Sequence, residues 1–276
     1  MTSYKIVLSY DGTDYYGWQR QPDKPTVQGT VEKALERIVG KKAALTGAGR
    51  TDAGVHALGQ TAGFRADTKI PDAELFKALN ALLPDDIRIV SLDRVPAEFN
   101  ARRDAQGKIY QYRIWTSPAI SPFAVRYVLH WPYPLNVRKM RDAAAMFVRE
   151  GDFTGFSSAA GAPGLARGSA SAVLACDYDS RASGEPQARP LTNRILSPVR
   201  SVIRSEIRKK GDELIYTVEA RGFLRYMVRT IVGTLLEVGR GRVPADAIDE
   251  IFQAKARTLA SPTAPAKGLC LVKVIY

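Results

Sequence analysis

The segment YKIVLSY at Tyr4–Tyr10 sets the fold class, because it opens a regular alternation of strand and helix patterns. Its apolar residues alternate with polar ones, which places Ile6, Leu8 and Tyr10 on one face of a half-buried strand. The expected elements that follow are a helix between a Thr26 cap and Gly40, a strand at Ala57–Phe64, a helix at Asp72–Leu83 with Leu82 facing inward, and a strand at Ile87–Val95. This order predicts an α+β fold with helices packed on one face of a sheet.

The second half of the chain repeats this pattern. The expected elements are a strand at Lys108–Trp115, a helix at Asn136–Val148, a hairpin of Val199–Arg208 and Glu213–Ala220, a long helix within Gly222–Val238 that buries Leu224, a short helix near Asp246–Gln253, and a strand at Leu269–Tyr276. We therefore expect two similar α/β halves, residues 1–104 and 105–276, and not one continuous barrel. The segment 159–193 differs, because 20 of its 35 residues are Gly, Ala, Ser or Pro. A mobile insertion that a partner orders and plain disorder both fit this composition.

Composition favours a nucleic-acid partner and gives no sign of a metal centre. The chain of 276 residues carries 40 Lys and Arg against 28 Asp and Glu, a formal net charge of +12. Nucleic acid is a common partner of so basic a surface, although charge that serves solubility alone is the simpler alternative. The two Cys and two His residues are far apart and match no zinc or redox spacing. Without a membrane span or a secretory leader, the sequence predicts a cytoplasmic protein.

The densest local signal is GAGRTDAGVHA at Gly47–Ala57. Its glycines allow a sharp turn and a close approach to another molecule, and Asp52 stands among them with Arg50 before it and His56 after it. A glycine-rich turn between strands is one interpretation. A phosphate-binding loop is a weaker one, because the Lys-Ser/Thr ending of a P-loop is missing.

Five blocks together resemble the TruA family of tRNA pseudouridine synthases. They are GRTDAGVHA at Gly49–Ala57, YDGT with GWQ at 10–19, KIYQY at 108–112, GFLRYMVR at 222–229 and GLCL at 268–271. They occur in the family's order and span nearly the whole chain. The resemblance implies an extended, mostly antiparallel sheet with an RNA cleft between the halves, a homodimer, and isomerisation of uridine at positions 38–40 of the tRNA anticodon stem-loop. No cofactor or metal is implied.

The resemblance also assigns roles to individual residues. It implies that Asp52 is the catalytic nucleophile, that Arg229 pairs with it, and that Tyr110 stacks on the target base. Arg50 corresponds to the residue that helps to extrude the uridine. One of Leu269 and Leu271 corresponds to the apolar wall of the pocket, and we favour Leu269.

The chemistry of pseudouridine formation fits these residue types. The C1′–N1 bond breaks, the uracil turns, and C5 joins C1′ without net redox change, so one ionised carboxylate such as Asp52 suffices as nucleophile or base. Attack of Asp52 on base or sugar and proton abstraction from C2′ both stay open. A noncatalytic RNA-binding protein on the same scaffold is the alternative function. A hydrolase is disfavoured, because no G-x-S-x-G motif is present.

Other residues admit simpler roles. We expect His56 to order its loop and not to act as an acid or base. Trp18 fits either stacking on RNA or burial against the first helix. Arg200, Arg204 and Arg208 are evenly spaced on a strand, which predicts one basic face, either a phosphate track or a solvated surface.

Overall fold

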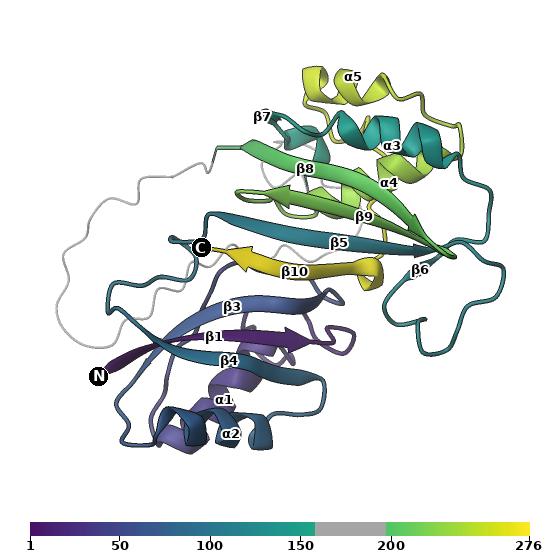
Figure 1. Ribbon diagram of the computed structural model, residues 1–276. Helices are drawn as coiled ribbons and strands as arrows, with labels where there is room; N and C mark the ends of the chain where they lie inside the picture. The colour runs from purple at the N-terminus through teal and green to yellow at the C-terminus, as the bar shows by residue number, and fades with distance from the viewer. Residues whose placement is uncertain (158–196) are drawn as a thin grey trace.

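The computed structural model describes residues 1–157 and 197–276 and shows one open sheet with helices against it (Figure 1). The strands of the first half are β1 (Thr2–Tyr10), β2 (Thr46–Gly47), β3 (His56–Ala66) and β4 (Ile87–Val95), with helices α1 (Val27–Val39) and α2 (Asp72–Leu82). Those of the second half are β5 (Gly107–Trp115), β6 (Leu129–His130), β7 (Glu150–Asp152), β8 (Val199–Lys210), β9 (Glu213–Ala220) and β10 (Leu269–Ile275), with helices α3 (Val137–Ala145), α4 (Met227–Gly239) and α5 (Ala247–Ala254). The predicted insertion at 159–193 lies outside the described residues.

The ten strands form a single mixed sheet that joins both halves, which confirms the predicted α+β class. Its order is β4-β1-β3-β10-β5-β9-β8-β7, with β2 beside β3 and β6 beside β5. Most neighbours are antiparallel, whereas β10 with β3 and β6 with β5 are parallel. The last strand of the chain therefore lies between the two halves (Figure 1). The boundary expected near Asp104 falls between β4 and β5 and stays a prediction.

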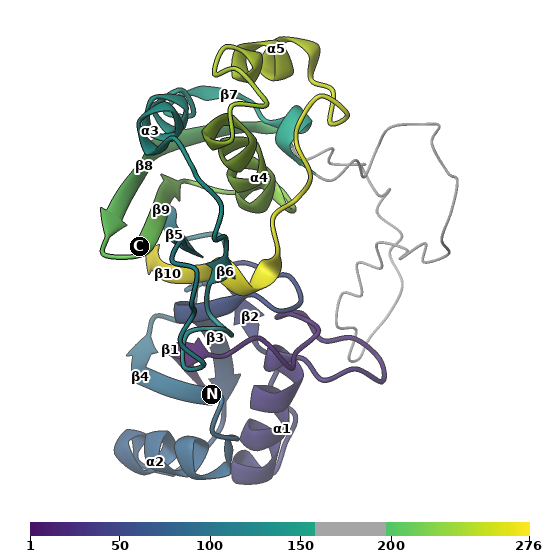
Figure 2. The ribbon, with the colours of Figure 1, turned by 90° about the vertical axis from the view of Figure 1, so that its right-hand side faces the viewer.

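One row of residues crosses the centre of the sheet on the face that the helices cover. The register pairs Tyr10 with Ala57, Ala57 with Leu271, Leu271 with Tyr110, Tyr110 with Val218, and Val218 with Ser205. All six residues are buried. Ser205 donates its hydroxyl to the carbonyl of Ala144 in α3, which places that helix on this face. Helices α1 and α4 also lie to one side of the sheet (Figure 2), so both halves share a helix-covered face.

Local signals account for both ends of the first helix. The Thr26 side chain accepts a hydrogen bond from the Gly29 amide at the start of α1, and Gly40 ends this helix with a φ of 71°. Helix α2 buries Leu75 and Leu79, but the expectation that Leu82 faces inward was wrong, because its side chain is exposed. None of the helices in the described parts of the chain has the length and hydropathy needed to cross a membrane.

Two further predictions fail because of backbone irregularities. Helix α4 begins at Met227, because Tyr226 adopts a left-handed conformation, so Leu224 lies before the helix. In β8 the register shifts between Val202 and Arg204, and this bulge moves the buried positions from even to odd numbers. Arg200 therefore shares the helix-covered face with buried Val202, while Arg204 points to the opposite face. Arg208 lies with Arg204 there, and both pair with Glu206.

Candidate active site

The loop that carries Asp52 is fixed by the segment after β1. The Trp18 amide donates to the carbonyl of Thr51 at 3.0 Å, and the Thr51 hydroxyl lies 2.8 Å from that of Tyr10. Gly17 permits this approach, since a Cβ there would lie 2.5 Å from the Thr51 carbonyl oxygen. Trp18 itself is buried, so burial and not stacking on RNA explains this tryptophan.

His56 orders the same loop, as its isolation in the sequence suggested. Its Nδ1 accepts from the Gly12 amide at 3.1 Å, and its Nε2 lies 3.1 Å from the Arg126 carbonyl oxygen, to which it donates. Burial lowers the pKa of His56, against the opposing charge of Asp11. His56 Nδ1 also lies 3.1 Å from Asp11 Oδ1, so both ring nitrogens have partners within the structure and neither is free for catalysis.

Asp52 and Arg229 come together from opposite halves of the chain. Asp52 Oδ2 lies 3.5 Å from Arg229 Nη1, and the side chains retain only 26% and 16% exposure. Burial raises the pKa of the Asp52 carboxyl, while the charges of Arg229 and Arg225 oppose this effect. A carboxylate with a raised pKa is a stronger base and nucleophile when ionised, and the guanidiniums favour its ionised form.

Arg229 is itself held by two contacts. Its Nε donates to the Ala264 carbonyl at 2.7 Å, and its guanidinium lies 5.1 Å from the centre of the Tyr226 ring. The guanidinium of Arg225 lies 4.8 Å from the same ring. Tyr226 has a φ of 62°, an unusual conformation for a bulky residue, and such strain concentrates at functional sites. Tyr226 thus connects both cations that act on Asp52.

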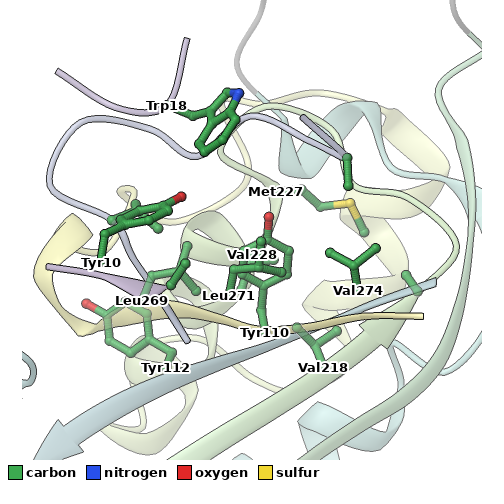
Figure 3. Close-up of a cluster of buried hydrophobic side chains, with 14 of the residues drawn as sticks. Tyr10, Trp18, Tyr110, Tyr112, Val218, Met227, Val228, Leu269, Leu271 and Val274 are labelled. Carbon is green, nitrogen blue, oxygen red and sulfur yellow. The ribbon is translucent and has the colours of Figure 1, made fainter. Parts of the chain in front are cut away.

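Tyr110 lies in an apolar cluster (Figure 3), near enough to Asp52 for the carboxylate charge to act on its hydroxyl. The side chain is only 7% exposed, and its ring contacts that of Phe223 edge to face, with centres 5.0 Å apart. Burial raises the pKa of the Tyr110 hydroxyl, and the negative charge of the nearby Asp52 raises it further. A hydroxyl that stays neutral suits a packing role for Tyr110.

The remaining predicted site residues lie at different depths. Leu269 and Leu271 are both buried near Tyr110, and the register places Leu271 directly opposite Tyr110 and Leu269 opposite Tyr112 (Figure 3). Arg50 is exposed at the edge of the loop, where its Nε donates to Gln19 Oε1 at 3.1 Å. The structure therefore groups Asp52, Arg229, Tyr110 and both leucines, and leaves Arg50 toward solvent.

Sequence reasoning missed the residues that position the predicted ones. Tyr226, Phe223 and Ala264 act through ring contacts and a carbonyl, for which the sequence has no pattern. Arg225 was visible only as the residue four positions before Arg229. The one available signal was the block GFLRYMVR itself, which holds three of these residues together with Arg229.

Comparisons with known proteins agree with this arrangement. The sequence pattern of a family described as tRNA pseudouridine synthase matches residues 6–103 and 188–276. The chain is 37% identical over 276 residues to tRNA pseudouridine synthase A of Thermodesulfovibrio yellowstonii, with both chains fully covered. It is 39% identical, again over the whole of both chains, to the proteins of that name from Thermoanaerobacter pseudethanolicus and Acetivibrio thermocellus. With such similarity along its entire length, the chain belongs to the tRNA pseudouridine synthases, which are isomerases that modify tRNA.

Proposed function

We propose that this synthase isomerises uridine at positions 38–40 of the tRNA anticodon stem-loop, with Asp52 as its catalytic carboxylate. The observation that carries the proposal is the Asp52–Arg229 pair, 3.5 Å apart and mostly buried, with its carboxylate near enough to Tyr110 to act on the Tyr110 hydroxyl. A carboxylate, a cation that orients it and a flat apolar surface for a base are what the reaction requires.

The uridine must leave the stacked RNA before it reaches Asp52. Unstacking costs roughly a few kcal/mol, and stacking on an aromatic side chain returns about 1–3 kcal/mol. Arg50, exposed at the edge of the loop, is suited to enter the space that the base leaves. Tyr110 is nearly buried, so the base can stack on most of the Tyr110 ring only after a neighbour such as Phe223 moves aside. Leu269 or Leu271 then closes the apolar side of the pocket.

Asp52 then drives the exchange of one glycosidic bond for another. On the first route its carboxylate attacks base or sugar as the C1′–N1 bond breaks; on the second it removes the proton from C2′. In both, the freed uracil turns and C5 bonds to C1′. The bond to Asp52 breaks again on the first route, and Asp52 returns the proton to C2′ on the second. C5 finally loses its proton and N1 gains one, so that substrate and product are isomers. Arg229 keeps the carboxylate oriented and its negative charge compensated throughout.

The partner and the assembly follow from the same proposal. A net charge of +12 suits a folded tRNA, and binding should therefore weaken steeply with salt. We propose a homodimer across which one tRNA lies, and a cytoplasmic location, where its substrate is found. Light scattering after size exclusion measures the assembly, and a strict monomer at micromolar concentration contradicts it.

A map of pseudouridine in tRNA treated with the purified protein tests the substrate assignment. Chemical labelling of pseudouridine followed by primer extension locates each modified position in unmodified tRNA transcripts. We expect product at one or more of positions 38–40 and at no other uridine. Product only elsewhere in the tRNA contradicts the assignment, while tRNA binding without any product supports the noncatalytic alternative.

A further inference from the structure

Lys108 lies on the active-site face of the sheet, although the mechanism gives it no task. It precedes Tyr110 by two residues on β5, so both side chains point to the helix-covered face. The register confirms this placement, because Lys108 pairs with Ala220 and Val274, which are both buried. Lys108 is thus the neighbour, on the same face of β5, of the aromatic ring on which we propose that the base stacks.

The Lys108 side chain extends over the backbone of the catalytic loop. A Cβ on Gly49 would lie 3.1 Å from Lys108 Cε and 3.3 Å from its Nζ, so the end of the lysine side chain lies against the Gly49 backbone. The same stretch of backbone is held in place, because Gln60 donates its side-chain amide to the Gly49 carbonyl at 2.9 Å. Gly49 lies three residues before Asp52, which brings the ammonium group close to the catalytic loop.

The charges of two arginines act on the ammonium group. The bulge in β8 turns Arg200 to the helix-covered face, where its side chain reaches within 3.8 Å of the Cβ position of Gly222. Burial lowers the pKa of Lys108, and the charges of Arg102 and Arg200 lower it further. Within residues 1–157 and 197–276, none of these three cations pairs with a carboxylate, whereas Arg204 and Arg208 on the other face both do.

Lys108 and Arg200 are partly buried, and partly buried cations without an acidic partner are unfavourable until an anion binds to them. We propose that Lys108, with Arg200 beside it, binds the backbone phosphate adjoining the target uridine. The inference rests on the function proposed above, since that function places the base on Tyr110. A phosphate fixed at Lys108 sets how far the flipped nucleotide enters, and so brings its C1′ to Asp52.

The proposal is tested by removing the charge from each side of the contact. Lys108→Met keeps the apolar stem and removes the ammonium, while a single methylphosphonate linkage neutralises one phosphate in an anticodon stem-loop RNA. We expect Lys108→Met to weaken binding about tenfold. The plot of log K against log salt, which has a negative slope, should become shallower by about 1. One methylphosphonate beside the target uridine should weaken binding to the wild type by a similar factor, but should not weaken binding to Lys108→Met further.

Controls separate this contact from general charge and from misfolding. Lys108→Arg should restore most of the affinity, and Lys77→Met, on α2 beside Glu74, should bind like the wild type. If Lys108→Met has a clearly lower Tm than the wild type, the same binding measurements are made with Arg200→Met, for which we expect the same results. The proposal is overturned if Lys108→Met binds RNA with wild-type affinity. It is also overturned if, wherever the methylphosphonate is placed, its loss of affinity adds in full to the loss caused by Lys108→Met. The cycle measures binding alone, so a failure of the proposed function appears separately, as an RNA that binds but gains no pseudouridine.

Discussion

Replacing Arg229 by Met leaves Asp52 in its partly buried position without the cation that pairs with it. The ion pair joins Asp52 Oδ2 and Arg229 Nη1 at 3.5 Å, which corresponds to roughly 5 kcal/mol of Coulomb energy at an effective dielectric constant of about 20. Both side chains keep some exposure, so water screens part of this interaction. We therefore expect a loss of about 2.7 kcal/mol in the transition state, or about 100-fold in kcat. Arg229→Lys should recover little, because one ammonium cannot reach both Asp52 and the Ala264 carbonyl.

The pH dependence of this variant gives an independent test. Asp52 acts when it is ionised, so activity falls as the pH drops through its pKa. Burial already raises this pKa, and Arg229 opposes the rise, so its removal should move the acidic limb of the profile to higher pH.

Release of tritium from tRNA labelled at C5 of uridine measures both effects, because C5 loses its hydrogen in the reaction. Arg242→Met is the matched control, since Arg242 is exposed and pairs with Glu237 at 3.8 Å, and it should behave like the wild type. A variant with unchanged kcat, or with the acidic limb where the wild type has it, refutes the role of Arg229.

Three further predictions concern the residues around this pair. Burial makes ionisation of Asp52 oppose folding, so Asp52→Asn should raise Tm by a degree or two at pH 7, on the order of a fraction of 1 kcal/mol for a domain of this size. In calorimetry this increase in Tm should shrink as the pH falls towards the ordinary pKa of 3.8. Tyr226→Leu should lower kcat about tenfold through loss of the contact with both guanidiniums, whereas Tyr226→Phe should keep kcat within about threefold of the wild type. Gly17→Ala should cost more than about 2 kcal/mol in urea unfolding and impair activity, because its Cβ would meet the Thr51 carbonyl. Gly40→Ala, also at positive φ but in open space, should cost only about 1 kcal/mol and leave activity unchanged.

Much of the fold could be predicted from the sequence, because its strands and helices follow simple periodicities. The alternation in Tyr4–Tyr10 gives the correct buried face of β1. The Thr26 and Gly40 signals give the observed start and end of α1. The bulge after Val202 could not be predicted, since one extra residue reverses every later side chain and nothing in VRSVIRSE marks it. The evenly spaced arginines of β8 were therefore assigned to one face when they lie on two.

The candidate site shows the same division. The block around Asp52 is distinctive enough to identify its family, and the role of His56 follows from its isolation. Tyr226 escaped prediction because its left-handed conformation contradicts the local preference of a bulky residue. Lys108 escaped because its significance depends on three chain segments that meet only in the folded sheet.

The most direct test of the central claim is a comparison of Asp52→Asn with the wild type on the same tRNA, with binding and turnover measured separately. Asn has the shape of Asp but no charge, so tRNA affinity should stay within about threefold while pseudouridine at positions 38–40 disappears, even with enzyme in excess over tRNA. A variant that still forms pseudouridine under these conditions contradicts the assignment of Asp52 as the catalytic carboxylate.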